Sequence, residues 1–108
     1  MGFQKASEKE YTPMLPGIAR RTLAYGESTL LAEFVMEQGA VLPSHSHPQE
    51  QTGYLVSGRM MLTIGEEEND VRPGDAWIVP GGVTHGARVI EDCVAVEVFS
   101  PVRQDYLP

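Results

Sequence analysis

The 108-residue chain has little of several residue types, and each shortage excludes a class of protein. Its single cysteine, Cys93, excludes an internal disulfide and suits a reducing cytosol. Only eight lysines and arginines stand against 15 aspartates and glutamates, so the formal net charge is −7. Such a chain repels phosphate groups, which argues against binding to nucleic acid or to an anionic membrane. There is no apolar run of the ~20 residues that a membrane span needs, nor a signal-peptide core. We therefore expect a soluble, cytoplasmic protein.

The sequence also lacks a helical hydrophobic pattern of useful length, and this predicts an all-β fold. Residues 1–17 are polar and then punctuated by proline, which predicts an extended N-terminal arm. Residues 18–108 have room for one domain. Many short apolar segments between glycine- and proline-rich turns indicate a sandwich or a barrel. The expected strands cover residues 18–25, 28–38, 50–56, 59–64, 76–79 and 92–99.

Two of the connections carry specific expectations. Ser57-Gly58 separates two apolar segments and predicts a hairpin turn, with Met60, Leu62 and Ile64 facing the core. Residues 66–70 are acidic and predict a solvated loop, because they lack the spaced ligands and glycine of an EF-hand calcium site.

Three histidines and one glutamine are the side chains of this sequence that could together bind a metal ion. His45 and His47 lie two residues apart, so in an extended segment both rings leave the same face. Gln51 shares their parity and offers an amide oxygen, and His85 adds a third imidazole from the second half of the chain. The alternative is that the histidine pair is ordinary and lies in a loop beside a turn.

The spacing of these residues resembles the two motifs of the cupin family. The first motif has Gln51 where glutamate is usual, and the second ends at Val89 where asparagine is usual. The matching positions of the first motif are Gly39, His45, His47, Gln51 and Gly58. Those of the second motif are Gly74, Pro80, Gly82 and His85. The resemblance covers nearly the whole chain and implies a double-stranded β-helix, the small jelly-roll barrel.

The resemblance also implies a metal site formed by His45, His47, Gln51 and His85. Three imidazoles and an amide oxygen suit one divalent transition metal, namely Zn, Fe, Ni, Mn or Co, better than calcium. Because all four ligands are neutral, the ion would keep its formal +2 charge and would anchor carboxylate or hydroxyketone oxygens well. The alternative is a decayed site that binds no metal.

Glu97 is a carboxylate within the otherwise apolar strand 92–99. It shares a face with Cys93, Ala95 and Phe99, and the opposite face carries valines. A buried carboxylate is costly unless it is paired or used. The alternative is that the valines form the core and that Glu97 faces solvent. Trp77, the only tryptophan, is expected in the core or at an interface without a functional role.

A closer resemblance, to the pectin-degradation cupins, assigns roles to three residues. It rests on residues 45–51, Thr84-His85-Gly86, Glu91-Asp92 and the ending 98–107. Those enzymes open the ring of 4,5-unsaturated uronates. The resemblance implies that Glu97 and Arg103 are catalytic residues and that Phe99 lines the substrate pocket. The acid is usually aspartate in that family, and the longer glutamate leaves the exact substrate open.

Three functions follow from these patterns. The first is a metal-dependent enzyme of the isomerase or lyase kind that acts by proton transfer on a small acidic sugar or hydroxyketone. The second is a cupin dioxygenase, and the third is a non-catalytic sugar- or metabolite-binding module. In each case the partner is a small anionic metabolite. We also expect a homodimer, because the arm has apolar side chains without an obvious partner in its own chain, at Tyr11, Met14, Leu15 and Ile18.

Overall fold

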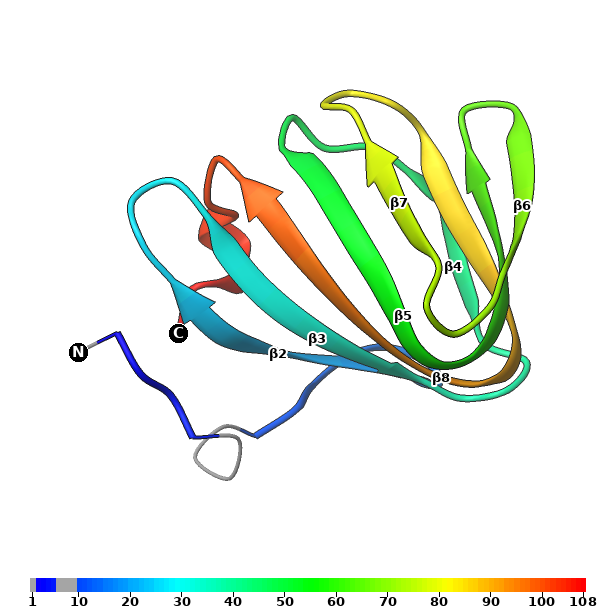
Figure 1. Cartoon of the computed structure of the whole chain (residues 1–108), viewed down its shortest axis with the longest axis horizontal. Coiled ribbons are helices and arrows are strands. Elements are labelled where there is room, and N and C mark those ends of the chain that lie inside the picture. Colours follow the sequence, from blue (N-terminus) through cyan, green and yellow to red (C-terminus); the bar gives the residue numbers. More distant parts are fainter. Residues whose placement is uncertain (1, 6–9) are drawn as a thin grey trace.

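The computed structural model describes residues 2–5 and 10–108, and within these ranges the chain is almost entirely β-structure (Figure 1). Residues 1 and 6–9 of the predicted arm lie outside the described residues. The strands are β1 Thr12–Leu15, β2 Ile18–Tyr25, β3 Leu30–Met36, β4 Val41–His45, β5 Glu50–Ile64, β6 Glu67–Val71, β7 Ala76–Val79 and β8 His85–Ser100. A short 3-10 helix, η2 Gln104–Tyr106, follows β8. The predicted all-β jelly-roll fold is confirmed.

Two long strands, β5 and β8, run through both halves of the barrel and pair with each other along most of their length. The first half of β5 and the second half of β8 are flanked by β7 on one side and by β3, β2 and β1 on the other. The other halves of the same two strands are flanked by β6 and β4. Both strands bend where these halves meet, so the sheet folds over on itself (Figure 1).

Alternation along the strands places the core between the two halves of the sheet. In β3 every second residue from Leu30 to Met36 is buried, which is the period expected of a strand with one buried face. In β8, Cys93, Ala95 and Phe99 are buried, so the valines between them face outward. Met60 and Leu62 are also buried, and Ile64 packs against the core, as predicted.

The hairpin predicted at Ser57-Gly58 is wrong, because β5 continues through these residues. Both halves of β5 pair with β8, and the register shifts between Leu55 and Met60 mark a β-bulge rather than a reversal. Gly58 has φ +93°, and a Cβ there would lie 2.1 Å from the carbonyl oxygen of Asp92. Glycine is therefore needed for the close approach of β5 to β8 at the bend.

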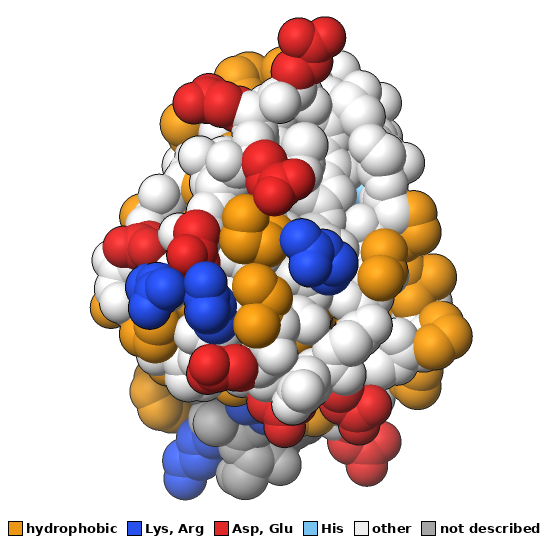
Figure 2. Space-filling model, turned by 90° about the vertical axis from the view of Figure 1, so that its right-hand side faces the viewer, with side chains coloured by type: hydrophobic (Ala, Val, Ile, Leu, Met, Phe, Trp, Pro, Cys, Tyr) orange, Lys and Arg blue, Asp and Glu red, His pale blue; other side chains and the backbone are white. Residues whose placement is uncertain are grey.

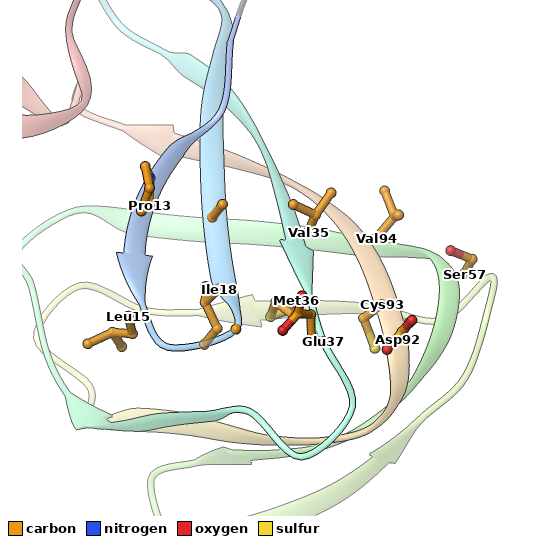
Figure 3. A pocket seen from close by; sticks show the side chains of 12 residues that line it. Pro13, Leu15, Ile18, Val35, Met36, Glu37, Ser57, Asp92, Cys93 and Val94 are labelled. Atoms are coloured by element: carbon orange, nitrogen blue, oxygen red, sulfur yellow. The ribbon is translucent and has the colours of Figure 1, made fainter.

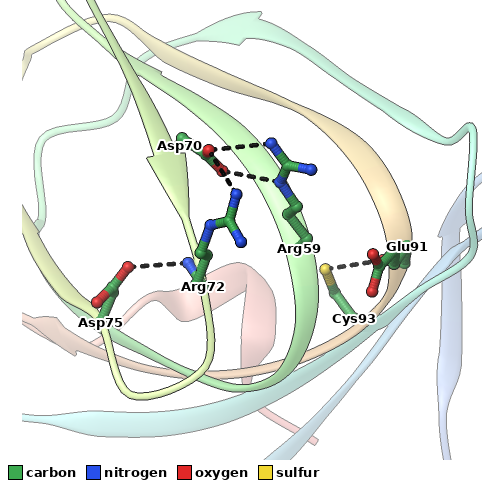
Figure 4. Close-up of polar contacts among 6 residues, drawn as sticks. All are labelled: Arg59, Asp70, Arg72, Asp75, Glu91 and Cys93. Atoms are coloured by element: carbon green, nitrogen blue, oxygen red, sulfur yellow. Dashed lines mark hydrogen bonds and ion pairs between the residues drawn. The ribbon is translucent and has the colours of Figure 1, made fainter.

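The acidic loop predicted at residues 66–70 is also wrong in part, since Glu67–Val71 forms strand β6 against the end of β5. The carboxylate of Asp70 accepts hydrogen bonds at 3.0 Å from both Nε and Nη2 of Arg59, and one at 3.3 Å from Arg72 (Figure 4). The hydrogen bonds from Arg59 hold the pKa of Asp70 below its usual range. The ion pair of Asp70 with Arg59 links β6 to β5, and the cross-strand pairing outweighs the low β propensity of the acidic sequence.

The predicted arm contains strand β1, which pairs with β2. Several apolar residues that we expected to lack partners have them in the same chain: Ile18 is buried in the core and Met14 packs against it. Tyr11 donates a hydrogen bond to Glu33. That expectation is therefore wrong for these three residues, whereas Leu15 remains exposed.

The surface agrees with the acidic composition. On the face seen in Figure 2, acidic and basic side chains are interspersed with apolar ones, and this face has no broad basic patch. Among the described residues, no helix is long and apolar enough to cross a membrane.

Candidate metal centre and active site

Two loops at the same end of the barrel bring the three histidines together. His45 ends β4 and His85 begins β8, and the two residues are direct partners in the antiparallel pairing of these strands. His47 lies in the loop between β4 and β5, where its carbonyl oxygen accepts a 2.8 Å hydrogen bond from the backbone N–H of Gly82. This bond joins the loop to the β7–β8 connection, at the top of Figure 1.

All three imidazoles are held in the same protonation pattern. The Nδ1 atoms of His45, His47 and His85 lie 2.9, 3.0 and 3.0 Å from backbone carbonyl oxygens of nearby residues. A carbonyl oxygen only accepts, so each Nδ1 carries a proton, and a ring that holds no second proton presents a bare Nε2. Burial lowers the pKa of His47 and of His85 below the usual 6.5, which favours the neutral form of these two rings.

This pattern fits a transition-metal ion. One ligand atom from each histidine lies within 4.8 Å of the other two, close enough for a single ion. Nε2 of His85 is buried and has no hydrogen-bond partner among the described residues. A buried nitrogen left without a partner is costly, and coordination of a metal ion would satisfy it.

Gln51, at the start of β5, completes the set of candidate ligands. The side-chain oxygen of this buried residue, Oε1, lies 2.9 Å from Nε2 of His47. Because Nδ1 of His47 already donates to a carbonyl oxygen, these two facing atoms are both acceptors when the ring is neutral. A cation bound by both atoms would remove the repulsion between these two acceptors, so their arrangement suits two ligands of one ion.

Glu97 faces into the barrel next to these ligands, and not outward. Its Oε1 accepts one hydrogen bond from Nε1 of Trp77 at 2.9 Å and another from Nε2 of Gln51. Burial raises the pKa of Glu97, while these two hydrogen bonds and the charge of Arg103 oppose the shift. A raised pKa brings a carboxyl group closer to the pH at which it can both take up and release a proton, as general acid–base catalysis requires.

Aromatic and cationic side chains line the pocket beside the histidines. Phe99 is buried, with its ring centroid 5.7 Å from that of His47 and 5.4 Å from that of Tyr106. The guanidinium of Arg103 lies 4.1 Å from the ring centroid of Tyr106 and 5.2 Å from that of Phe99. Nε and Nη2 of Arg103 donate to the carboxylate of Asp105 at 3.2 and 2.7 Å. This pairing uses two of the five N–H groups of Arg103 and leaves three for a ligand.

The cavity between these groups is small, about 50 Å³. This volume has room for only a few water molecules, so a sugar acid could occupy the cavity only if side chains around it moved. A larger hollow of about 510 Å³ lies elsewhere, on the outer face of β1, β2, β3 and β8 (Figure 3). It is lined mainly by apolar side chains, and its carboxylates, Glu37 and Asp92, have no imidazole beside them. The candidate catalytic and metal-binding side chains therefore lie around the smaller cavity and not around the larger hollow.

The structure brings together all seven residues that the sequence singled out for the site. His45, Gln51, His85, Glu97, Phe99 and Arg103 line the cavity, and His47 contacts Gln51 and Phe99. The sequence analysis missed two participants. Trp77, expected in the core or at an interface without a functional role, packs against the core and also donates a hydrogen bond to Glu97, and the ring of Tyr106 lies against the guanidinium of Arg103. No local pattern marks the contact of Trp77 with Glu97, because it depends on pairing between distant strands, whereas Arg103 and Tyr106 lie only three residues apart, around η2.

Comparison with known proteins defines the class. Residues 32–100, well over half of the chain, match the family model described as the cupin domain. The chain therefore belongs to the cupin family. Among solved structures it is similar to KdgF from a Halomonas species, with 32% sequence identity, a TM-score of 0.92 and coverage of 97% of both chains. An RmlC-like cupin from Shewanella frigidimarina shares the fold, with a TM-score of 0.94 and 24% identity over 99% of this chain and 96% of that one.

Curated relatives match over shorter spans. An uncharacterized protein of Streptomyces coelicolor is 35% identical over 69 residues, or 63% of this chain and 66% of that protein. Oxalate decarboxylase OxdC of Bacillus subtilis is 27% identical over 67% of this chain and 20% of its own length. H2HPP isomerase of Bacillus subtilis is 28% identical over 76% of this chain and 36% of its own length. The chain thus spans less than two thirds of each of these three relatives.

Proposed function

We propose that this cupin is a metal-dependent enzyme that acts on a small acidic sugar or hydroxyketone by proton transfer, with ring opening of an unsaturated uronate as the leading reaction. One observation carries the proposal: bare imidazole nitrogens, a buried carboxyl group and an arginine converge on one cavity. The resemblance to the pectin-degradation cupins and the similarity to KdgF over 97% of both chains support the reaction class.

The proposed metal ligands are His45, His47, Gln51 and His85. A divalent transition metal ion held there would supply Lewis-acid polarisation of substrate oxygens. Glu97 moves the proton through Oε2, because Oε1 is already engaged by Trp77 and Gln51. The two oxygens of the Glu97 carboxyl group thus have separate roles: Oε1 holds the group in position and Oε2 transfers the proton.

Arg103 is proposed to bind the substrate carboxylate with the N–H groups that Asp105 leaves free. A two-point contact of this kind is available to arginine and not to lysine. Phe99 and Tyr106 form the apolar wall that limits the access of water to the reacting atoms, and this strengthens the electrostatic interactions inside the cavity.

The test of the reaction is the loss of unsaturated-uronate absorbance, measured for wild type and for Glu97→Gln. We expect turnover by wild type and a kcat about 10²–10⁴-fold lower in the variant, which is the usual contribution of a general acid or base. If wild type turns over no unsaturated uronate, the proposed substrate is wrong. If Glu97→Gln keeps full activity, the role of Glu97 is wrong even where the substrate is right.

The test of the metal site is elemental analysis of protein purified without chelator. The His45→Ala, His47→Ala double variant should lose the metal that wild type contains, since two of four ligands are removed. Equal metal in both proteins would refute the site.

The match to a relative named H2HPP isomerase is in line with an isomerisation, a reaction that needs no oxidant. Comparing anaerobic with aerobic assays distinguishes the dioxygenase from the proton-transfer enzyme, because only an oxygenase requires O₂. A binding module would retain ligand and metal without turnover.

The proposal extends to a homodimer that covers the outer face of β5 and β7. Tyr54, Val56 and Ile78 are 47%, 50% and 47% exposed on this face, next to the outward valines of β8. Exposed apolar patches of this kind mark protein interfaces. Light scattering at micromolar concentration should give the dimer mass for wild type, and a lower mass for Ile78→Arg. Val41→Arg, at a residue 54% exposed on β4, is the control and should leave the mass unchanged. A monomeric wild type contradicts the proposal.

A further inference from the structure

Trp77, Gly53 and Glu97 lie side by side on the inner face of three neighbouring strands. Gly53 on β5 is the direct partner of Trp77 on β7 and of Glu97 on β8. The indole of Trp77 nevertheless reaches Glu97, which is two strands away or roughly 10 Å in backbone spacing. It does so by passing over Gly53, where an added Cβ would lie 2.2–2.4 Å from three atoms of the indole. The indole therefore occupies the space that a side chain at position 53 would fill.

The hydrogen bonds of Glu97 decide how the amide of Gln51 is oriented. A carboxylate oxygen only accepts, so the end of the Gln51 amide that faces Oε1 of Glu97 must be the NH₂ group. The carbonyl oxygen then faces Nε2 of His47, which is the orientation that a metal ligand requires. The reverse orientation would set two oxygens against each other and direct an N–H at the lone pair of His47.

We infer that Glu97 is a positioning residue for the metal site: it selects the orientation of Gln51 that directs the amide oxygen at the histidines, and Trp77, reaching across Gly53, holds Glu97 in place. The inference rests on the proposed metal ligand set. It adds a role to Glu97 that is separate from proton transfer, and it gives Trp77 and Gly53 a role in metal affinity, although neither offers a ligand to the ion.

The two roles of Glu97 can be separated by substitution. Glu97→Gln retains a carbonyl oxygen that can accept hydrogen bonds from Trp77 and Gln51, but its side chain cannot transfer a proton. Glu97→Leu introduces a side chain of similar size that can do neither. Trp77→Phe removes the indole N–H together with part of the bicyclic ring, and it keeps a smaller aromatic ring. Groups that orient metal ligands typically contribute 10–100-fold to metal affinity, so the expected differences are measurable.

The experiment is a competition titration of Ni²⁺ against a chelating dye, with metal-free wild type and each variant, and with circular dichroism to verify folding. We expect Glu97→Gln to bind within about threefold of wild type and Glu97→Leu to bind about 10–100-fold more weakly. Trp77→Phe should weaken binding by a smaller factor. The Trp77→Phe, Glu97→Leu double variant should be no weaker than Glu97→Leu alone, because Trp77 acts through Glu97.

The possible failures are distinguishable. A folded Glu97→Leu variant with the affinity of wild type overturns the inference alone, as does a Glu97→Gln variant that loses as much affinity as Glu97→Leu. Should Glu97→Leu not fold, an unchanged affinity in Trp77→Phe overturns it instead. Wild type that binds no Ni²⁺, or that binds it equally well as Gln51→Ala, refutes the proposed ligand set and the inference with it.

Discussion

Gly53→Ala is the smallest change that should disturb both the fold and the site. The added Cβ would lie 2.2 Å from the nearest atom of Trp77, whereas an ordinary contact begins near 3.4 Å, so the indole must move by roughly 1.2 Å. The hydrogen bond from Trp77 to Glu97 is 2.9 Å long, and a good N–H···O bond extends to only about 3.2 Å. The displacement of the indole is therefore several times larger than the lengthening that this hydrogen bond tolerates.

The expected loss of stability has two sources. Overpacking a well-packed core costs about 1–3 kcal/mol, and a hydrogen bond to a charged group contributes about 1.5–3 kcal/mol. The lower ends of these ranges together give about 2.5 kcal/mol. For a domain of this size, 1 kcal/mol shifts Tm by about 4 °C or more. Gly53→Ala should therefore lower Tm by at least about 10 °C.

Thermal unfolding followed by circular dichroism measures this shift, and fluorescence reports the cause, since Trp77 is the only tryptophan of the chain. The emission spectrum of Gly53→Ala should differ from that of wild type before unfolding begins. Gly26→Ala is the matched control, because an added Cβ there has no atom within 4 Å and the backbone φ is not in the left-handed region. The control should change the free energy of unfolding by less than about 1 kcal/mol.

A double-variant cycle with Trp77→Leu shows whether the clash with the indole is responsible. Gly53→Ala should cost at least about 1 kcal/mol less in the Trp77→Leu background than in wild type, because the shorter side chain leaves space for the methyl group. The reasoning is refuted if Gly53→Ala melts within 2 °C of wild type with an unchanged emission spectrum. An equal cost in both backgrounds refutes it as well.

Two further predictions concern charge. Arg103→Lys should raise KM for anionic substrates by about tenfold or more, while kcat changes by less than about threefold, because lysine cannot reproduce a two-point contact. Steady-state kinetics measures both, and an unchanged KM would contradict the proposed role. The free energy of unfolding of the metal-free protein should fall as the pH drops below 6.5, because burial lowers the pKa of His47 and His85 and the unfolded chain then binds more protons. Glu97 acts in the opposite direction, since its raised pKa lets the folded state bind a proton first. Denaturant titrations at pH 7.5 and at 4.5, the ordinary pKa of a glutamate, should therefore show a larger loss for Glu97→Gln than for wild type, and a smaller loss in the variant would be contrary to this account.

Local patterns in the sequence predicted those parts of the molecule that depend on neighbouring residues. Alternation in the segment 92–99 correctly divided β8 into two faces, and the structure decides which one is buried, with Glu97 on the inner side. The spacing of His45, His47 and His85 predicted a cluster that does form. In these cases the period of a strand and the fixed distances within a motif carry the information.

What the sequence could not predict depends on pairing between distant segments. Ser57-Gly58 has the local chemistry of a hairpin turn, and only the pairing of both halves of β5 with β8 shows that the chain continues. The acidic segment Glu67–Val71 has a low strand propensity, and its pairing with Met60–Ile64 overrides it. The contact of Trp77 with Glu97 likewise requires the register of three strands, which no single window of sequence contains.

The same register leads us to expect that the candidate site assembles without a metal ion. Gln51 is the direct strand partner of Phe99, and Gly53 is the partner of Glu97, so the backbone pairing of the two longest strands sets these side chains next to one another. The hydrogen bonds from Gln51 and Trp77 to Glu97 then fix the carboxyl group within the protein alone. A chelator should accordingly leave the protein folded, and added metal should raise Tm only by the mass-action effect of a ligand that binds the native state. An unfolded metal-free protein would contradict this, because it would mean that the ion, and not the pairing of β5 with β8, assembles the barrel.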